Sequence, residues 1–179
     1  MVQEVEATNQ ATSFQLVGRF LFEFALLETE VNKGIGKLFG LDDGRTSILA
    51  ANIDFSRKVK ILFSAESYIG ESPDKTRAEL VKRTRSKVLE LNTNRVMLAH
   101  SLFEARPGNK VMFYRVVADD KLNVSEIVWD HSNFESRFLS IQDVRAWIVQ
   151  IVETLKPYSP SLDFSDPRNS QYLSLIFGE

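Results

Sequence analysis

Arg95 and His100, in the segment N-R-V-M-L-A-H-S, are the residues of this 179-residue chain whose types and spacing could do chemistry. Cleaving RNA without a metal requires removing a proton from the 2′-hydroxyl, stabilising the phosphate and protonating the departing 5′-oxygen. An imidazole suits both proton transfers because its two protonation states coexist near neutral pH. A planar, permanently charged guanidinium suits the phosphate. The pair therefore predicts His100 as general acid/base and Arg95 as the phosphate ligand.

The spacing of this pair leaves its geometry open. Five positions on an ideal helix rotate a side chain by about 140°, so Arg95 and His100 do not share one narrow face. Side-chain reach, a distorted helix or a second chain must bring them together. His100 also has a structural interpretation, because a cation near a helix C-terminus gains ~0.3–1 kcal/mol from the helix dipole. A catalytic histidine and a structural or ligand-binding one both fit the sequence.

The element that must position the pair is a long helix predicted over residues 73–106. Ser72 is a good N-cap, and Pro73 fits the first helical position, where its missing N–H is not needed. Neither Gly nor Pro occurs between Pro73 and Pro107-Gly108, which ends the helix. Its apolar stripe consists of Leu80, Val88, Leu91, Leu98 and Phe103.

The first part of this helix is strongly basic. Residues 75–95 contain seven basic and two acidic side chains, in a chain whose formal net charge is −2. This asymmetry predicts a local track for a phosphate backbone, with Asn94 positioning the substrate or Arg95. The alternative is a solvated helix face with a few exposed ion pairs. The residues predicted to guide RNA are Lys82, Arg83, Arg85 and Lys87.

An earlier long helix is predicted over residues 13–39. Its apolar stripe runs from Phe14 to Leu38 with spacings of three and four, and Glu28 interrupts it. One interpretation places Glu28 at the edge of the buried face, with its carboxylate reaching water or a nearby basic side chain. The other pairs it with a cation of the functional helix, Arg95.

The rest of the chain predicts a mainly α fold with one added β-hairpin, placed between the long helix and the last helix. β-branched and aromatic residues indicate the hairpin within residues 110–130. Ser140 is predicted to cap the last helix, and residues 130–139 are expected to be irregular. The other predicted elements are helices over 46–52 and 54–68 and strands over 111–117 and 124–129.

The length of the chain suits one domain. We expect a flexible N-terminus over residues 1–12, because this segment is polar and acidic, and a single domain over residues 13–157. The tail over residues 158–179 is rich in proline and then ends in apolar residues. It is predicted to dock on the domain or on a dimer partner.

Composition excludes several kinds of chemistry. There is no cysteine, so disulfides, thiolate metal ligands and cysteine nucleophiles are absent. Two histidines without cysteine make a zinc site improbable within one chain, and no metal or other cofactor is predicted. No stretch approaches 18 uninterrupted apolar residues. These features predict a cytoplasmic protein that does not span a membrane.

The segment around the pair resembles the arginine–histidine motif of the HEPN superfamily. In these all-helical domains an arginine, four to six residues and a histidine lie near the end of a long helix. Asn92 and Asn94 before Arg95, and Ala99-His100-Ser101, strengthen the resemblance. Its specific part is about nine residues, although the order of elements matches in outline over residues 13–157.

The resemblance implies an antiparallel helical bundle and a metal-independent endoribonuclease, with Arg95 and His100 as catalytic residues. It also implies a homodimer whose pairs face a shared cleft, and a toxin–antitoxin or phage-defence system with a partner protein. Active members often have a polar residue after the arginine, where this chain has Val96. The alternatives are a non-catalytic helical dimer that binds nucleic acid or a partner protein, and a nucleotide- or small-molecule-binding domain.

Overall fold

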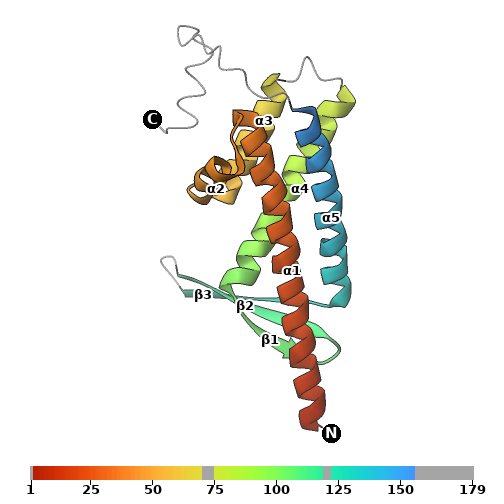
Figure 1. Cartoon of the computed structure of the whole chain (residues 1–179). Coiled ribbons are helices and arrows are strands. Elements are labelled where there is room, and N and C mark those ends of the chain that lie inside the picture. The colour runs from red at the N-terminus through yellow and green to blue at the C-terminus, as the bar shows by residue number, and fades with distance from the viewer. Residues whose placement is uncertain (1, 70–74, 119–121, 156–179) are drawn as a thin grey trace.

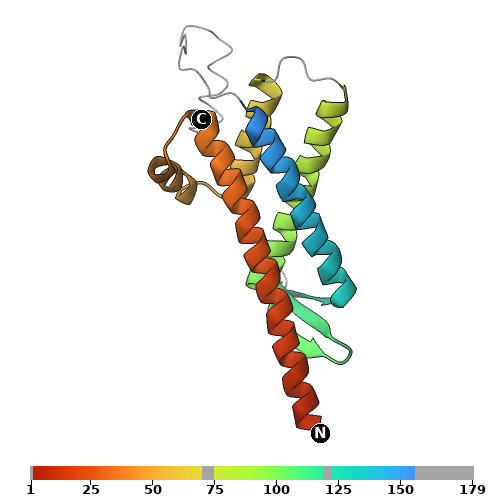
Figure 2. The same cartoon turned by 45° about the vertical axis from the view of Figure 1, so that its right-hand side comes forward.

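The computed structural model of this chain describes residues 2–69, 75–118 and 122–155. Within these ranges the protein is mainly helical, and α1, α3, α4 and α5 pack together as a bundle (Figures 1 and 2). A small antiparallel sheet lies where α4 ends and α5 begins, so the predicted mainly α fold with an added β element is confirmed. The elements are α1 Val2–Phe39, α2 Asp43–Ala51, α3 Phe55–Ile69, α4 Lys75–His100, β1 Leu102–Arg106, β2 Lys110–Ala118, β3 Leu122–Trp129 and α5 His131–Thr154. The predicted tail over 158–179 lies outside the described residues.

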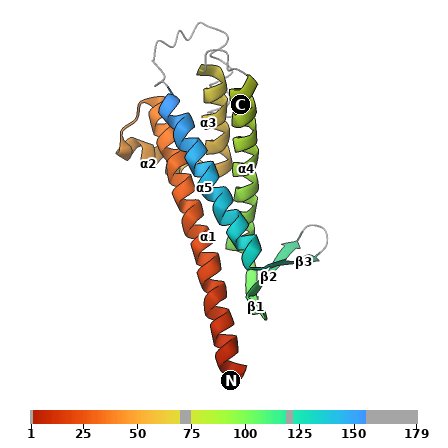
Figure 3. The same ribbon diagram turned by 90° about the vertical axis from the view of Figure 1, so that its right-hand side faces the viewer.

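Helix α1 is longer than predicted. It begins at Val2 rather than Ser13, so the segment expected to be a flexible N-terminus is helical from residue 2. Neither Gly nor Pro occurs before Gly18, so no residue there opposes the helix. The first turns of α1 extend past the sheet, away from the rest of the bundle (Figures 1 and 3). Phe14, expected to be buried, contacts the Phe103 ring on one side but stays 56% exposed.

Helix α4 ends at His100 rather than at residue 106, and the following residues form strand β1. Pairing with β2 places Phe103 opposite Phe113 and Arg106 opposite Lys110. In the tight turn between the strands, Gly108 and Asn109 have φ angles of 77° and 55°. Glycine adopts this region freely, and asparagine does so more easily than most residues. The segment L-F-E-A-R is locally compatible with a helix, so its pairing with β2 decides its conformation.

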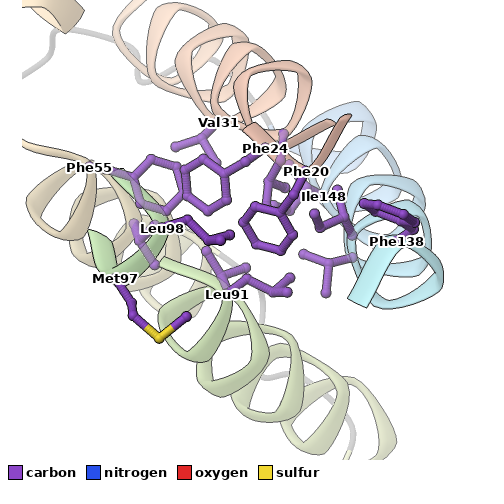
Figure 4. Close-up of a cluster of buried hydrophobic side chains, with 14 of the residues drawn as sticks. Phe20, Phe24, Val31, Phe55, Leu91, Met97, Leu98, Phe138 and Ile148 are labelled. Atoms are coloured by element: carbon purple, nitrogen blue, oxygen red, sulfur yellow. The ribbon is translucent and has the colours of Figure 1, made fainter. Parts of the chain in front are cut away.

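The sheet has the strand order β1-β2-β3, and the predicted hairpin corresponds to β2 and β3. Its inner face buries Val111, Phe113 and Trp129 against the helices. Side chains from all four bundle helices then continue this core without interruption (Figure 4). Members labelled in the figure include Phe20 and Phe24 of α1, Phe55 of α3, Leu91 and Leu98 of α4, and Phe138 and Ile148 of α5.

Helix α5 begins at His131 rather than Ser140, so the region expected to be irregular is helical. Its start is a reciprocal capping box between two side chains and two backbone groups. Asp130 Oδ1 accepts the Asn133 N–H at 2.9 Å, and Asn133 Oδ1 accepts the Asp130 N–H at 3.0 Å. Two donors that would lack helical partners are thereby satisfied. The sequence signal was D-x-x-N, directly before the buried Phe134.

Replacing Asp130 with asparagine should weaken the pH dependence of stability. Hydrogen bonds from the Ser132 hydroxyl and the Asn133 N–H lower the pKa of Asp130. A carboxyl whose pKa is lower in the folded chain stabilises it above the unfolded pKa, and this contribution disappears as the pH falls through the folded pKa. Asparagine keeps the cap without the charge. Between about pH 5 and pH 2, the melting temperature measured by circular dichroism should fall less for Asp130→Asn than for the wild type. Equal decreases would contradict this.

Candidate functional site

His100 is the last residue of α4, and its side chain is exposed. It forms no side-chain hydrogen bond or ion pair with any residue that the structure describes. His100 and Lys82 are eighteen positions apart, which is about five whole helical turns. They therefore project from the same side of α4, roughly 27 Å apart along its axis. Lys75 and Thr93 lie within about 20° of this line and are also exposed. We call these four residues the α4 outer line.

Arg95 belongs to a different side of α4. Its side chain is half-buried, and the guanidinium carbon lies 5.5 Å from the centre of the Phe24 ring on α1. This distance is near the outer limit of a cation–π contact. Arg95 is thus directed toward the bundle while His100 is directed toward solvent. The two predicted catalytic side chains therefore do not meet within one protomer. Their spacing of five positions on a straight helix separates them by about 140°, so this separation is expected.

The asparagines before Arg95 face neighbouring elements. Asn92 Nδ2 donates to Ser56 Oγ of α3 at 3.0 Å and so connects the two helices. Asn94 Nδ2 is buried and has no acceptor within the described ranges. Leaving such a donor unpaired costs about 1–3 kcal/mol, so this amide would gain from a ligand that supplies a hydrogen-bond acceptor. Its role in positioning a substrate stays a prediction.

The four predicted RNA-guiding residues differ in how available they are. Lys82 and Arg85 are exposed and make no hydrogen bond or ion pair with a described residue. Arg83 lies over Trp147 of α5, with its guanidinium carbon 5.6 Å from the ring centre. Lys87 pairs with Glu90, Nζ to Oε2 at 3.0 Å. Lys82 and Arg85 are therefore the two cations most accessible to a phosphate backbone.

Glu28 contacts Lys58 of α3, with Nζ and Oε1 2.7 Å apart. In the described part of the chain it forms no ion pair with Arg95, so the proposed Glu28–Arg95 pairing is not the one adopted. The side chain of Lys58 is only 5% exposed and that of Glu28 is 32% exposed. Lys58 was not identified from the sequence as a partner of Glu28. Its spacing of three and four from Phe55 and Leu62, both buried, was the signal that could have located it.

Glu104, Arg106 and Tyr114 form a polar cluster on the outer face of the sheet, which was not predicted from the sequence. Arg106 Nη2 donates to Tyr114 Oη at 2.8 Å, and Tyr114 Oη donates to Glu104 Oε2 at 2.9 Å. The Tyr114 hydrogen bond, followed by the charge of Glu104, raises the pKa of Arg106. Strand alternation places all three on one face, but only the β1–β2 register brings them together. Their polar groups bind one another, which indicates that the cluster stabilises the pairing of β1 with β2.

Within the described residues, no group of three or more His, Asp or Glu side chains could hold a metal ion. No helix in those ranges has both the length and the apolar character needed to cross a bilayer. Comparison with protein-family models, with curated proteins and with solved structures finds no match for this chain. The functional argument therefore depends on the geometry of α4 and its surroundings.

Proposed function

We propose that this protein is a metal-independent endoribonuclease of the HEPN type, with His100 as its general acid/base. The observation that carries the proposal is the exposed imidazole of His100, which has no polar partner among the described residues and lies on the same line of α4 as Lys82. RNA bound along Lys82 and Arg85 would reach His100 at the end of the helix. The chain carries a net charge of −2, so this local surface has to supply the attraction for RNA.

In the proposed reaction, His100 removes the proton of a 2′-hydroxyl, and the oxygen attacks the adjacent phosphorus. The bond to the 5′-oxygen breaks, and the imidazolium returns its proton to that oxygen. The products are a 2′,3′-cyclic phosphate and a 5′-hydroxyl, so atoms and charges balance. Arg95 would stabilise the pentacoordinate phosphate, either after leaving Phe24 or from a second protomer. A cation–π contact contributes about 0.5–2 kcal/mol, more as the pair is buried, and each charge-assisted hydrogen bond contributes about 1.5–3 kcal/mol. Two such bonds from the guanidinium to a phosphate would therefore outweigh the contact with Phe24.

The direct test is incubation of end-labelled single-stranded RNA with the purified chain in excess EDTA. We expect fragments that carry 2′,3′-cyclic phosphate and 5′-hydroxyl ends. Activity that disappears with the chelator would indicate metal-dependent chemistry instead. Binding of RNA without any fragments would overturn the catalytic part of the proposal.

A second candidate is a non-catalytic RNA-binding protein that uses the same surface. The observation that favours it is the direction of Arg95, which lies over Phe24 on another side of α4 from His100. Such a protein would bind RNA through Lys82 and Arg85 and leave it intact. In either case, a neutralising partner protein of a toxin–antitoxin or phage-defence system would act by covering the α4 outer line.

Both candidates predict that the double variant Lys82→Gln/Arg85→Gln binds RNA more weakly. Each phosphate contact to a single strand contributes about 0.7 to the slope of log K against log salt concentration. Losing two should reduce this slope by about 1.4, measured by fluorescence anisotropy at several salt concentrations. The matched control is Lys33→Gln/Arg45→Gln, which removes two exposed cations from α1 and α2. If the two double variants weakened RNA binding equally, RNA affinity would depend on the total positive charge of the protein and not on this surface of α4.

A further inference from the structure

An apolar stripe runs along the solvent side of α1 and stays largely exposed, although Phe14 at its edge contacts the Phe103 ring of β1. Its aromatic members are Phe14, 56% exposed, and Phe22, 63% exposed. Its small members are Ala11, Gly18 and Ala25, which are also exposed. Spacings of three, four, four and three keep all five within about 80° of one another on a helix. We call this set the α1 stripe.

Gly18, at the centre of the stripe, is not required by packing against any part of the chain that the structure describes. A methyl group added at Gly34 would come within 2.8 Å of Leu62 Cδ1, so close packing requires that glycine. A methyl group at Gly18 would meet nothing within 4 Å. Glycine is among the least favourable residues in an exposed helix interior. Its presence at this position fits a surface that another backbone approaches closely.

The stripe is also symmetric about Gly18. Phe14 and Phe22 lie four positions on either side of it, and Ala11 and Ala25 lie seven positions on either side. A twofold axis through Gly18 would pair each residue of an antiparallel helix with its mirror position, as a self-complementary interface requires. Four positions rotate a side chain by about 40°, in opposite directions for the two phenylalanines. Phe14 and the partner's Phe22 would therefore lie side by side across the seam instead of colliding.

We propose that a second copy of this chain packs its α1 stripe antiparallel against this one, with the twofold axis at Gly18. Residues 11–14 would then lie on the Phe22–Ala25 region of the partner. The first turns of α1, which extend past the sheet (Figure 3), would lie beside about residues 29–34 of the partner's α1. The stripe spans about 21 Å of each helix, and a contact of this length buries on the order of 800 Å² in total. This is small for a specific interface, so the dimer should form in the micromolar range. Because the stripe lies apart from the Phe24 side that meets Arg95, this proposal is independent of the ribonuclease activity.

Single cysteines test the geometry, since the chain contains none. Gly18→Cys places its thiol at the axis, so mild oxidation should convert most of the protein to a covalent dimer. In an antiparallel pair, cysteines at position 25 are separated by about 21 Å, too far for a disulfide. Ala25→Cys should therefore remain mostly uncrosslinked. Cross-linking of both variants to the same extent, or of neither, would overturn the antiparallel arrangement.

The oligomeric state of the unmodified chain provides a second measurement. Analytical ultracentrifugation near 100 µM should give twice the 20.4 kDa chain mass for the wild type. Phe22→Glu should weaken association at least tenfold, because it places a carboxylate in the seam. Ile48→Glu on α2, which changes a side chain that is 70% exposed, should leave association unchanged. A monomeric wild type at this concentration would overturn the proposal.

Discussion

Replacing His100 with alanine should lower the rate of RNA cleavage by about 10²–10⁴-fold, the usual contribution of a positioned acid/base group. The substitution should leave the fold intact, because the side chain is exposed and lies outside the hydrophobic core of the described residues. RNA affinity should change little, since the cations of α4 remain. Single-turnover cleavage assays and anisotropy measurements separate these two effects.

His131 provides the matched control for this experiment. It is the other histidine of the chain, it is exposed at the start of α5, and its Nε2 lies 3.9 Å from Glu135 Oε1. His131→Ala should cleave RNA at the wild-type rate. A His100→Ala variant that cleaves as fast as His131→Ala would remove His100 from the mechanism and leave the binding function as the better explanation of the surface.

Replacing Glu28 with glutamine should lower the free energy of unfolding by about 2–3 kcal/mol. Lys58 is almost completely buried, and the substitution leaves its ammonium group without a compensating charge. Removing one partner of a fully buried pair costs about 3–5 kcal/mol. The lower figure applies here because a third of Glu28 is exposed and glutamine can still accept a hydrogen bond. Urea denaturation followed by circular dichroism measures the difference.

Two further variants distinguish the loss of a buried ion-pair partner from the loss of a negative charge as such. Glu30→Gln removes the partner of Lys33 on the same helix. The Lys33 side chain is 62% exposed and stays solvated without its partner, so this change should cost less than about 1 kcal/mol. Glu28→Gln combined with Lys58→Met removes both charges and should recover most of the lost stability, because methionine fills the buried site. A double variant no more stable than Glu28→Gln would show that the lost charge partner is not the cause.

The positions of Glu28 and Arg95 show what sequence reasoning could not resolve. Glu28 was correctly identified as a charge that interrupts an apolar stripe, but its partner depends on which helix packs against that point of α1. Lys58 and Arg95 come from different helices, and periodicity along one helix carries no information about the neighbour. Likewise, Asn94 was identified as a polar residue beside Arg95, but its buried, unpaired amide became visible only in the packed bundle.

Local information was sufficient for the presence and order of the main helices, for the β2–β3 hairpin and for the absence of thiol chemistry. Their signals are short in range: side chains three or four positions apart in a helix, and alternation in a strand. The ends of α1, α4 and α5 were not located in this way. The 140° separation of Arg95 and His100 also follows from helix geometry alone. The capping box at Asp130 was equally local, and D-x-x-N would have located the start of α5.

Tertiary structure alone decided where α4 gives way to β1, which cation Glu28 binds, and which side chains of α1 stay uncovered. Each outcome depends on contacts between residues far apart in the chain: Phe103 with Phe113, Glu28 with Lys58, and Phe14 with Phe103, a contact that leaves the Phe14 side chain 56% exposed. Local propensity is nearly neutral at these positions. The free energy of long-range pairing and burial therefore determines the outcome. These contacts form only when distant parts of the chain pack together, so local sequence patterns do not reveal them.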